Sequence, residues 1–305
     1  MGKIYFLNKA KYWFSFSTIL ICFGLYYMTS NFITTGSPFN LGIDFTGGVN
    51  FTINVEKATT EFNTDGKLSE QTRGEITSLI RKTMNEAGVS SLQLTTMDKY
   101  LFSLKFQQIE NISVDELAKK LTSTIEGTTI LGTDFIGPSV GHELQTQSLT
   151  ILGVAILLLL IYITLRFEFW AAIAAILALI HDVLIVLGLT ALLHIEINTA
   201  YVAALLTVLG YSINDTIVIF DRIRENLKEN KDELVDIINS SVDQSITRSI
   251  NTSFTTLAVL LSIFLFGGAS IKDFALVLLI GISFGTYSSI FIASPLLYRF
   301  KMLNQ

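Results

Sequence analysis

The sequence predicts a polytopic α-helical membrane protein, with six transmembrane helices and a small α+β, ferredoxin-like domain outside the membrane. The 305 residues are 50% hydrophobic and only 15% charged, and the mean hydropathy is +0.53. Those values are too apolar for a single soluble domain. Several apolar stretches reach the length of about 20 residues that a bilayer crossing requires. One long polar segment separates the first such stretch from the second.

The remaining predicted transmembrane helices all follow the long segment. The first covers residues 13–33, and helices two to six lie within 147–297, over the stretches 147–165, 170–193, 198–220, 250–267 and 274–297. Between the fourth and fifth, residues 221–247 are charged and helical in pattern, which predicts an amphipathic segment along the membrane surface. Residues 1–12 and 298–305 are the predicted termini outside the bilayer.

The basic residues predict the orientation of the chain in the membrane. With six spans, the lysines and arginines that flank them fall on one side, which the positive-inside rule makes cytoplasmic. They are Lys3, Lys9, Lys11, Arg166, Arg222, Arg224, Lys228, Lys231, Arg299 and Lys301. We therefore expect a protein of the bacterial cytoplasmic (inner) membrane with both termini cytoplasmic and residues 36–146 on the outer side.

Residues 36–146 show the patterns of a small folded domain. Alternation in "VNFTINV" (Val49–Val55) predicts a half-buried strand, and Ser113 with Glu116 predicts a capping box that opens a helix. Strands are also predicted in "SLQLTTM", "YLFSLKF" and "TTILGTDFI", and one helix carries Ile76, Leu79, Ile80 and Met84 on a single face. The order βαββαβ indicates a ferredoxin-like unit. The stretch "FIGPSVG" (Phe135–Gly141) is interpreted as a hinge into the second span.

Several classes of function have no support in the sequence. A net charge of -5 and a pI near 5.3 offer no basic surface for nucleic acid. The single cysteine allows no internal disulfide, and the three histidines are far apart without partnering cysteines, so no metal site is predicted. No phosphate-binding GxxxxGK[ST] loop occurs, so we expect neither nucleotide hydrolysis nor any other enzymatic activity, and no cofactor.

A carboxylate inside the fourth span is the feature that most needs an explanation. In "GYSINDTIVIFDRIREN" (Gly210–Asn226), Asp215 precedes the first surface charge, Asp221, by six residues. This spacing places it about 9 Å into the hydrocarbon at ~1.5 Å per residue. An aspartate at the centre of a transmembrane helix costs about 2.5–3.5 kcal/mol to insert. Some interaction within the protein must offset that cost.

Arg248 in the fifth span is the predicted partner of Asp215. Both residues lie at similar depths from the same surface, so a charge pair between the antiparallel helices is geometrically accessible. Polar residues that accompany the pair are Tyr211, Ser212, Asn214, Asn251 and Thr252. Two readings stay open: a static salt bridge between helices, or a proton relay driven by about 2.3 kcal/mol per 100 mV of membrane potential.

Two further polar groups have a structural and a functional reading. His181 and Asp182 in the third span form either a hydrogen-bonded pair that ties helices together or part of a proton path. Asp44, followed by Gly47 and Gly48, forms either a turn that leads into the first strand or a functional motif.

Taken together, the motifs resemble one known family along essentially the whole chain. "GIDFTGG", "IGPSVG", the "HD" pair, "GYSINDTIVIFDRIREN" and "TRSINTSFTT" are similar to those of the SecF subunits of bacterial protein export, which belong to the resistance-nodulation-division superfamily. Asp243 stands where an asparagine is common in that family. The resemblance implies a SecD partner, the SecYEG channel with SecA, a translocating polypeptide, the lipid bilayer and use of the proton-motive force.

The resemblance also implies roles for particular residues. Asp215 and Arg248 match the family's membrane aspartate and arginine, which are implicated in proton movement, and Asp44, Gly47 and Gly48 match a motif at the head of the outer domain. Two alternatives remain: half of a solute or lipid exporter of the same superfamily, and a non-conducting scaffold of the translocon. The exporter usually has a larger outer region and both halves in one chain.

Overall fold

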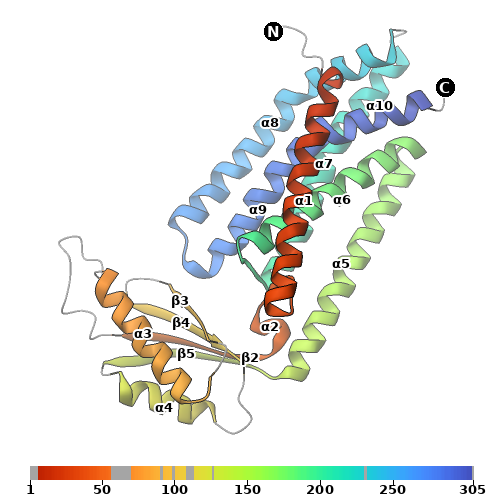
Figure 1. Cartoon of the computed structure of the whole chain (residues 1–305). Coiled ribbons are helices and arrows are strands. Elements are labelled where there is room, and N and C mark those ends of the chain that lie inside the picture. The colour runs from red at the N-terminus through yellow and green to blue at the C-terminus, as the bar shows by residue number, and fades with distance from the viewer. Residues whose placement is uncertain are drawn as a thin grey trace. The chain divides into compact units, whose positions relative to one another are not determined.

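The computed structural model describes residues 6–55, 70–89, 92–97, 100–107, 113–125, 127–229 and 232–303 (Figure 1). The chain divides into two compact units. Unit 1 comprises Met1–Asn40, Leu149–Gly267 and Ile271–Gln305, and unit 2 comprises Leu41–Ser148 with Gly268–Ser270. The basic residues Lys3 and Lys231 lie outside the described residues.

Unit 2 contains the predicted βαββαβ order. Its elements are β2 (Gly48–Val55), α3 (Glu70–Glu86), β3 (Gln93–Thr96), β4 (Leu101–Phe106), α4 (Val114–Thr124) and β5 (Thr128–Ile136). The strands form an antiparallel sheet in the order β3-β4-β2-β5, with the first and third strands of the motif adjacent at its centre. This topology is the ferredoxin-like arrangement that the sequence predicts.

One face of the sheet carries the core of unit 2. Alternate residues of β2, such as Phe51 and Ile53, are fully buried and pack with residues of both helices, so α3 and α4 cover the same face. Ile80 and Met84 lie in this core as predicted, but Leu79 is 40% exposed. The buried face of α3 follows a spacing of four residues, and Leu79 falls one residue outside it.

The helix α4 begins as predicted. The Ser113 hydroxyl accepts a hydrogen bond from the Glu116 amide at 3.2 Å, and both Leu117 and Leu121 are buried against the sheet. An N-terminal cap of this kind satisfies one of the four amides that a helix start leaves unpaired. The cap therefore fixes where the chain turns from extended to helical.

Unit 1 is built from helices. They are η1 (Leu7–Lys9), α1 (Ala10–Thr35), α5 (Pro138–Arg166, in unit 1 from Leu149), α6 (Phe169–Leu192), α7 (Thr199–Glu229), α8 (Leu234–Phe266), α9 (Ala269–Ser288, in unit 1 from Ile271), the π-helical η3 (Ser289–Ala293) and α10 (Ser294–Leu303). Two-residue strands, β1 (Asn40–Leu41) and β6 (Glu196–Ile197), lie beyond α1 and α6. Within the described residues, six helical segments are long and apolar enough to cross a membrane, as predicted.

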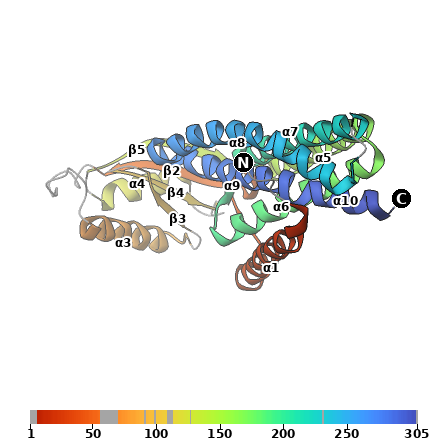
Figure 2. The ribbon, with the colours of Figure 1, turned by 90° about the horizontal axis from the view of Figure 1, so that it is seen from above.

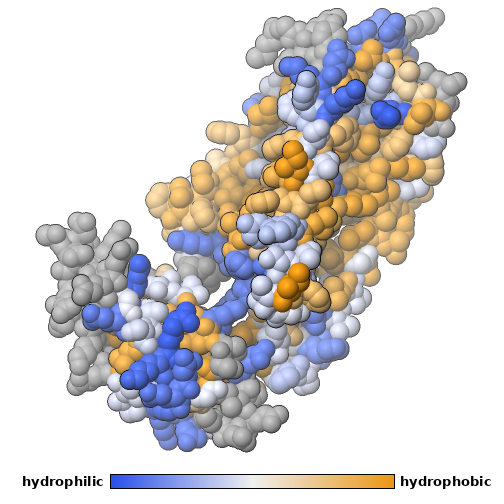
Figure 3. Space-filling model, viewed as in Figure 1, coloured by the Kyte–Doolittle hydropathy of each residue, from blue (hydrophilic) through white to orange (hydrophobic). Residues whose placement is uncertain are grey.

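The surface of unit 1 matches a lipid environment. Hydrophobic residues cover most of the visible face of its helices, and hydrophilic residues gather near the chain termini (Figure 3). In Figure 2, α1 lies on one side of α6 while α7 and α8 lie on the other.

The contact between α1 and α6 is close at two glycines. A Cβ on Gly24 would lie 2.6 Å from the Gly188 Cα. Small residues of this kind let transmembrane helices approach to backbone contact.

Residues 221–247 differ from the predicted surface segment. They form no separate helix: α7 continues to Glu229 and α8 begins at Leu234. The apolar and polar pattern that suggested a membrane surface packs instead between the two helices, where the Asn226 side chain donates to the Ser241 hydroxyl at 2.8 Å and Ile238 is fully buried. The apolar side chains of an amphipathic helix can be buried against a neighbouring helix as well as at a lipid interface.

The second and sixth spans also extend beyond their predicted bounds. The stretch Phe135–Gly141, which the sequence suggested as a hinge, forms the end of β5 and the first turn of α5. The helix begins at Pro138, because the fixed φ of proline is favourable at the first helical position. The last span runs on through η3 and α10 to Leu303.

Candidate functional site

Asp215 lies buried on α7, with 6% of its surface exposed. Its Oδ2 atom accepts hydrogen bonds from the Ser253 hydroxyl of α8 at 3.3 Å and from the Thr286 hydroxyl of α9 at 3.2 Å. The two hydroxyls are also in hydrogen-bond contact with each other. Three helices therefore converge on one carboxylate oxygen, and Oδ1 accepts no hydrogen bond from any described residue.

The hydroxyl groups around Asp215 have more possible acceptors within reach than they have hydrogen atoms to donate. The Thr286 hydroxyl is within reach of Asp215, of Ser253 and of the Ile282 carbonyl at 2.9 Å. A hydroxyl carries one hydrogen and two lone pairs, so it can donate to a carboxylate or accept from a protonated carboxyl group. This shell can therefore hold Asp215 in either protonation state after a rotation of the hydroxyls.

Two glycines of α9 bring its hydroxyls close to α7. A Cβ on Gly281 would lie 2.1 Å from the Val208 side chain, and one on Gly285 would lie 3.0 Å from Ser212 Cβ. The glycines are four residues apart and face two α7 residues with the same spacing, which is the small-xxx-small packing of transmembrane helices. Without this approach, Thr286 could not reach Asp215.

The predicted ion pair between Asp215 and Arg248 is not formed in the described structure. Within the described residues Asp215 has no salt bridge, and Arg248 is exposed on α8, five residues before Ser253. The physical reason is that the Cα–Cβ bonds of a helix tilt toward its N-terminus. Because α7 and α8 run antiparallel, the side chains of residues at equal depth lean in opposite directions along the membrane normal.

The polar residues that accompany Asp215 divide into two groups. Ser212 is buried, and Tyr211 is half-buried with its hydroxyl 3.3 Å from that of Thr256. The other group faces outward from unit 1 and consists of Asn214 on α7 with Arg248, Asn251, Thr252 and Thr255 on α8. Exposed polar side chains at membrane depth are unfavourable against lipid tails.

Asp182 on α6 forms a second and more enclosed carboxylate site. It is completely buried. Its Oδ1 is 2.8 Å from His181 Nδ1, and its Oδ2 accepts from the Ser288 hydroxyl at 2.7 Å and from the Ser212 hydroxyl. The ring of Tyr287 stacks on His181 with centroids 6.2 Å apart. The structure thus places His181 and Asp182 in a network that ties α6 to α7 and α9.

The two carboxylate sites share the same pair of helices. On α7, Ser212 precedes Asp215 by three residues, and on α9, Thr286 precedes Ser288 by two. A displacement of α9 relative to α7 would therefore act on both sites. The π-helical segment η3 begins at Ser289, directly after this pair, and such segments occur frequently at functional sites.

Sequence reasoning did not identify Ser253, Thr286 or Ser288. The signal that could have located the last two is the glycine pair Gly281 and Gly285, because polar residues just after a small-xxx-small stretch lie beside the helix that packs on it. For Ser253 the signal was weaker, since α8 carries several hydroxyl residues and only packing decides which of them faces α7.

The Asp44 motif lies in unit 2, at the start of its sheet. Asp44 is in the one-turn helix α2 (Ile43–Thr46), and Gly47 follows with φ +71°, a region that favours glycine. A Cβ on Gly47 would lie 2.8 Å from Pro138 Cα, and one on Gly48 would lie 2.5 Å from the Phe106 carbonyl oxygen. The two glycines thus allow three backbone segments to meet at the entry to the sheet.

No group of three or more His, Cys, Asp or Glu side chains that could hold a metal ion occurs among the residues with described positions. The chemistry available at the buried sites is hydrogen bonding and proton exchange between carboxylates, hydroxyls and one imidazole.

Comparisons with known proteins place these features in one family. Residues 116–303 match the family described as "Protein export membrane protein SecD/SecF, C-terminal", and residues 32–59 match the "SecD/SecF GG Motif". The protein translocase subunit SecF of Sebaldella termitidis is 39% identical over 300 residues, which cover 97% of this chain and 92% of that protein. SecF of Haemophilus influenzae is 37% identical over 297 residues, with 96% and 85% covered.

A solved structure agrees in fold. The crystal structure of SecDF from Thermus thermophilus, described as a translocon-associated membrane protein, matches 99% of this chain with a TM-score of 0.82 and 32% identity. The match covers 39% of the SecDF chain. With a family match over more than half its length and near full-length relatives above 30% identity, this chain belongs to the SecD/SecF family of protein-export membrane proteins.

Proposed function

We propose that this chain is a subunit of the bacterial protein-export translocase in the cytoplasmic membrane, and that protonation of Asp215 couples the proton-motive force to its movement. The observation that carries the proposal is the hydroxyl shell of Asp215, in which Ser253 and Thr286 converge on one carboxylate oxygen inside a transmembrane helix. Relatives named protein translocase subunit SecF support the assignment to export.

The shell suits a group that gains and loses a proton better than a tight ion pair would. A guanidinium can only donate hydrogen bonds, so a close Asp–Arg pair favours the charged carboxylate alone. Hydroxyls can reverse direction, and those of Ser253 and Thr286 have each other as alternative partners. In this proposal Arg248, nearer the cytoplasmic end of α8, attracts the charged form of Asp215 from a distance and releases it when the proton binds.

The outward-facing polar residues support a second membrane chain beside this one. Asn214, Arg248 and Asn251 face away from unit 1 at depths where lipid tails would surround them. A partner helix that covers α7 and α8 would remove this penalty. The relative in Thermus thermophilus is named SecDF, and this chain spans 39% of its solved structure, so we infer that a SecD chain supplies the missing half.

We further propose that both termini are cytoplasmic and that unit 2 faces the outer side, where it contacts emerging polypeptide delivered through SecYEG by SecA. The sheet face opposite α3 and α4 supports this role, since within unit 2 it carries polar side chains. Asn50 illustrates its chemistry, with hydrogen bonds to Asp134 at 3.1 Å and to Ser103 at 2.7 Å. Such a face can exchange hydrogen bonds with an extended chain without burying it permanently.

The substitution Asp215→Asn tests the proposal directly. It nearly preserves shape but removes the titratable group, so the proton-driven component of export in inverted membrane vesicles should fall to the level seen without the chain. Asp243→Asn, which changes an exposed carboxylate of α8, is the matched control and should leave export unchanged. Full proton-driven export with Asp215→Asn would eliminate the relay and favour the scaffold alternative, in which the chain only stabilises the translocon.

A further inference from the structure

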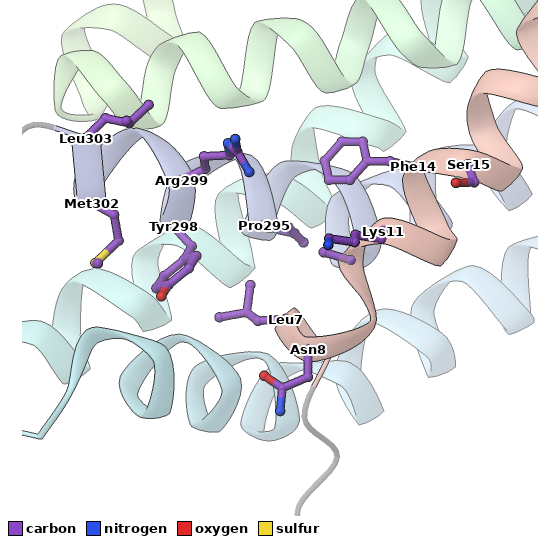
Figure 4. A pocket seen from close by; sticks show the side chains of 11 residues that line it. Leu7, Asn8, Lys11, Phe14, Ser15, Pro295, Tyr298, Arg299, Met302 and Leu303 are labelled. Atoms are coloured by element: carbon purple, nitrogen blue, oxygen red, sulfur yellow. The ribbon is translucent and has the colours of Figure 1, made fainter.

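A cavity of about 730 Å³ lies in unit 1 where the first helix begins and the last one ends (Figure 4). One wall comes from η1 and the start of α1, and the other wall comes from α10. Leu7 and Leu303 are the end residues of the first and sixth candidate spans. The cavity therefore lies at the level where a transmembrane helix leaves the hydrocarbon and meets the headgroups.

Two cations line this cavity without an acidic counterpart. Lys11 and Arg299 both contribute to its walls, and the described residues of the lining include no aspartate or glutamate. Neither cation forms a salt bridge with any residue of the described part of the chain. Two other cations at the same end of unit 1 are neutralised: Lys301 by Glu168 at 2.6 Å and Arg166 by Asp221 at 2.7 Å. The cavity thus holds unpaired positive charge that favours an anion.

The remainder of the lining is mainly apolar. Leu7, Phe14 and Leu303 border the cavity together with the two cations (Figure 4). The face of α1 that carries Lys11 and Phe14 continues along the helix, where Leu25, three turns after Phe14, is 46% exposed. A free phosphate would leave that apolar surface in contact with water, so the site fits a ligand with a negative head and a hydrocarbon tail.

We propose that this cavity binds an anionic phospholipid, with its phosphate between Lys11 and Arg299 and an acyl chain along the exposed face of α1. Tyr298, also in the lining, supplies an amphipathic ring of the kind that is favoured at headgroup depth. Lipid binding at this site does not depend on the proposed export mechanism or on Asp215.

Native mass spectrometry of the purified, delipidated chain tests the site with two probes of equal acyl composition, phosphatidylglycerol and phosphatidylcholine. The unsubstituted chain should prefer phosphatidylglycerol by about thirtyfold, since each of the two basic residues near an anionic headgroup contributes about 1 kcal/mol. The double variant Lys11→Gln/Arg299→Gln should bind both lipids equally. Both side chains are exposed, so we expect the variant to fold normally, which an unchanged thermal midpoint verifies.

Matched variants separate the site from general electrostatics. Arg224→Gln/Lys228→Gln removes the same amount of positive charge from a different helix, α7, and should keep the preference for phosphatidylglycerol. Lys11→Arg/Arg299→Lys keeps both charges at the site and should show the preference that the Gln double variant lacks. Soluble glycerol phosphate should not displace the lipid. The proposal fails if the first double variant keeps its preference, if the α7 variant loses as much, or if glycerol phosphate competes fully, which would indicate a simple phosphate site.

Discussion

Asp182 and Asp215 are buried carboxylates in adjacent helices of one unit, but their surroundings differ. Both oxygens of Asp182 have partners, from His181, Ser212 and Ser288, and the residue has no exposed surface. Asp215 is bonded through one oxygen only, by hydroxyls with competing acceptors. A carboxylate with both oxygens engaged holds its partners in one arrangement, whereas a carboxylate engaged through a single oxygen can rearrange at low cost.

The difference assigns separate tasks to the two groups. Asp182 ties α6 to α7 and α9, and in the proposed mechanism Asp215 is the group that gains and loses the proton. The contacts of Asp182 are expensive to break, because each lost hydrogen bond leaves another buried group unsatisfied. The comparison therefore predicts that substitutions at Asp182 act mainly on stability and that substitutions at Asp215 act mainly on function.

The largest effect should follow from separating the helices that both sites share. Gly281→Leu places a side chain where even a Cβ would meet Val208 at 2.1 Å, so both networks should open and the apparent unfolding free energy should fall by about 3 kcal/mol. Thermal unfolding in detergent measures this loss. Gly153→Leu on α5, where a Cβ meets nothing within 4 Å, is the control and should change little.

A smaller stability effect should separate the two carboxylates from each other. Asp182→Asn replaces an acceptor of three hydrogen bonds by a group that must also donate, and should cost about 2 kcal/mol of unfolding free energy. Asp215→Asn should cost less than about 1 kcal/mol, because only one oxygen is engaged. Parallel unfolding measurements on the two variants decide the matter, and equal losses would contradict the division of tasks.

The smallest effect should come from trimming the shell of Asp215 by one hydroxyl. Thr286→Val keeps the volume of the side chain and removes one donor to Asp215, which should slow proton-driven export by about threefold to tenfold. Export in vesicles measures the change. Thr164→Val removes a hydroxyl whose hydrogen bond within the described residues is made to the Leu160 carbonyl of the same helix, α5, and should leave the rate unaltered. An unaffected rate with Thr286→Val would show that this hydroxyl takes no part.

Unit 2 illustrates how far the periodicity of the sequence can predict a fold. Alternation in Val49–Val55, the cap at Ser113 and the strand Thr128–Ile136 were all predicted and are all present. Each is a local signal, since it depends on neighbours within about four residues. Leu79 was misplaced because apolar residues at spacings of three and four are both compatible with a helical face, and only the position of the sheet distinguishes them.

The sequence by itself determined the number of spans, the βαββαβ order and the presence of a carboxylate that must be compensated inside the membrane. These follow from bilayer thickness, local periodicity and the cost of burying charge, which act along one chain segment at a time. Only the tertiary structure decided that Ser253 and Thr286, rather than Arg248, contact Asp215. The reason is geometric: the contacts across helices depend on how closely glycines let them pack and on the direction in which each side chain leans.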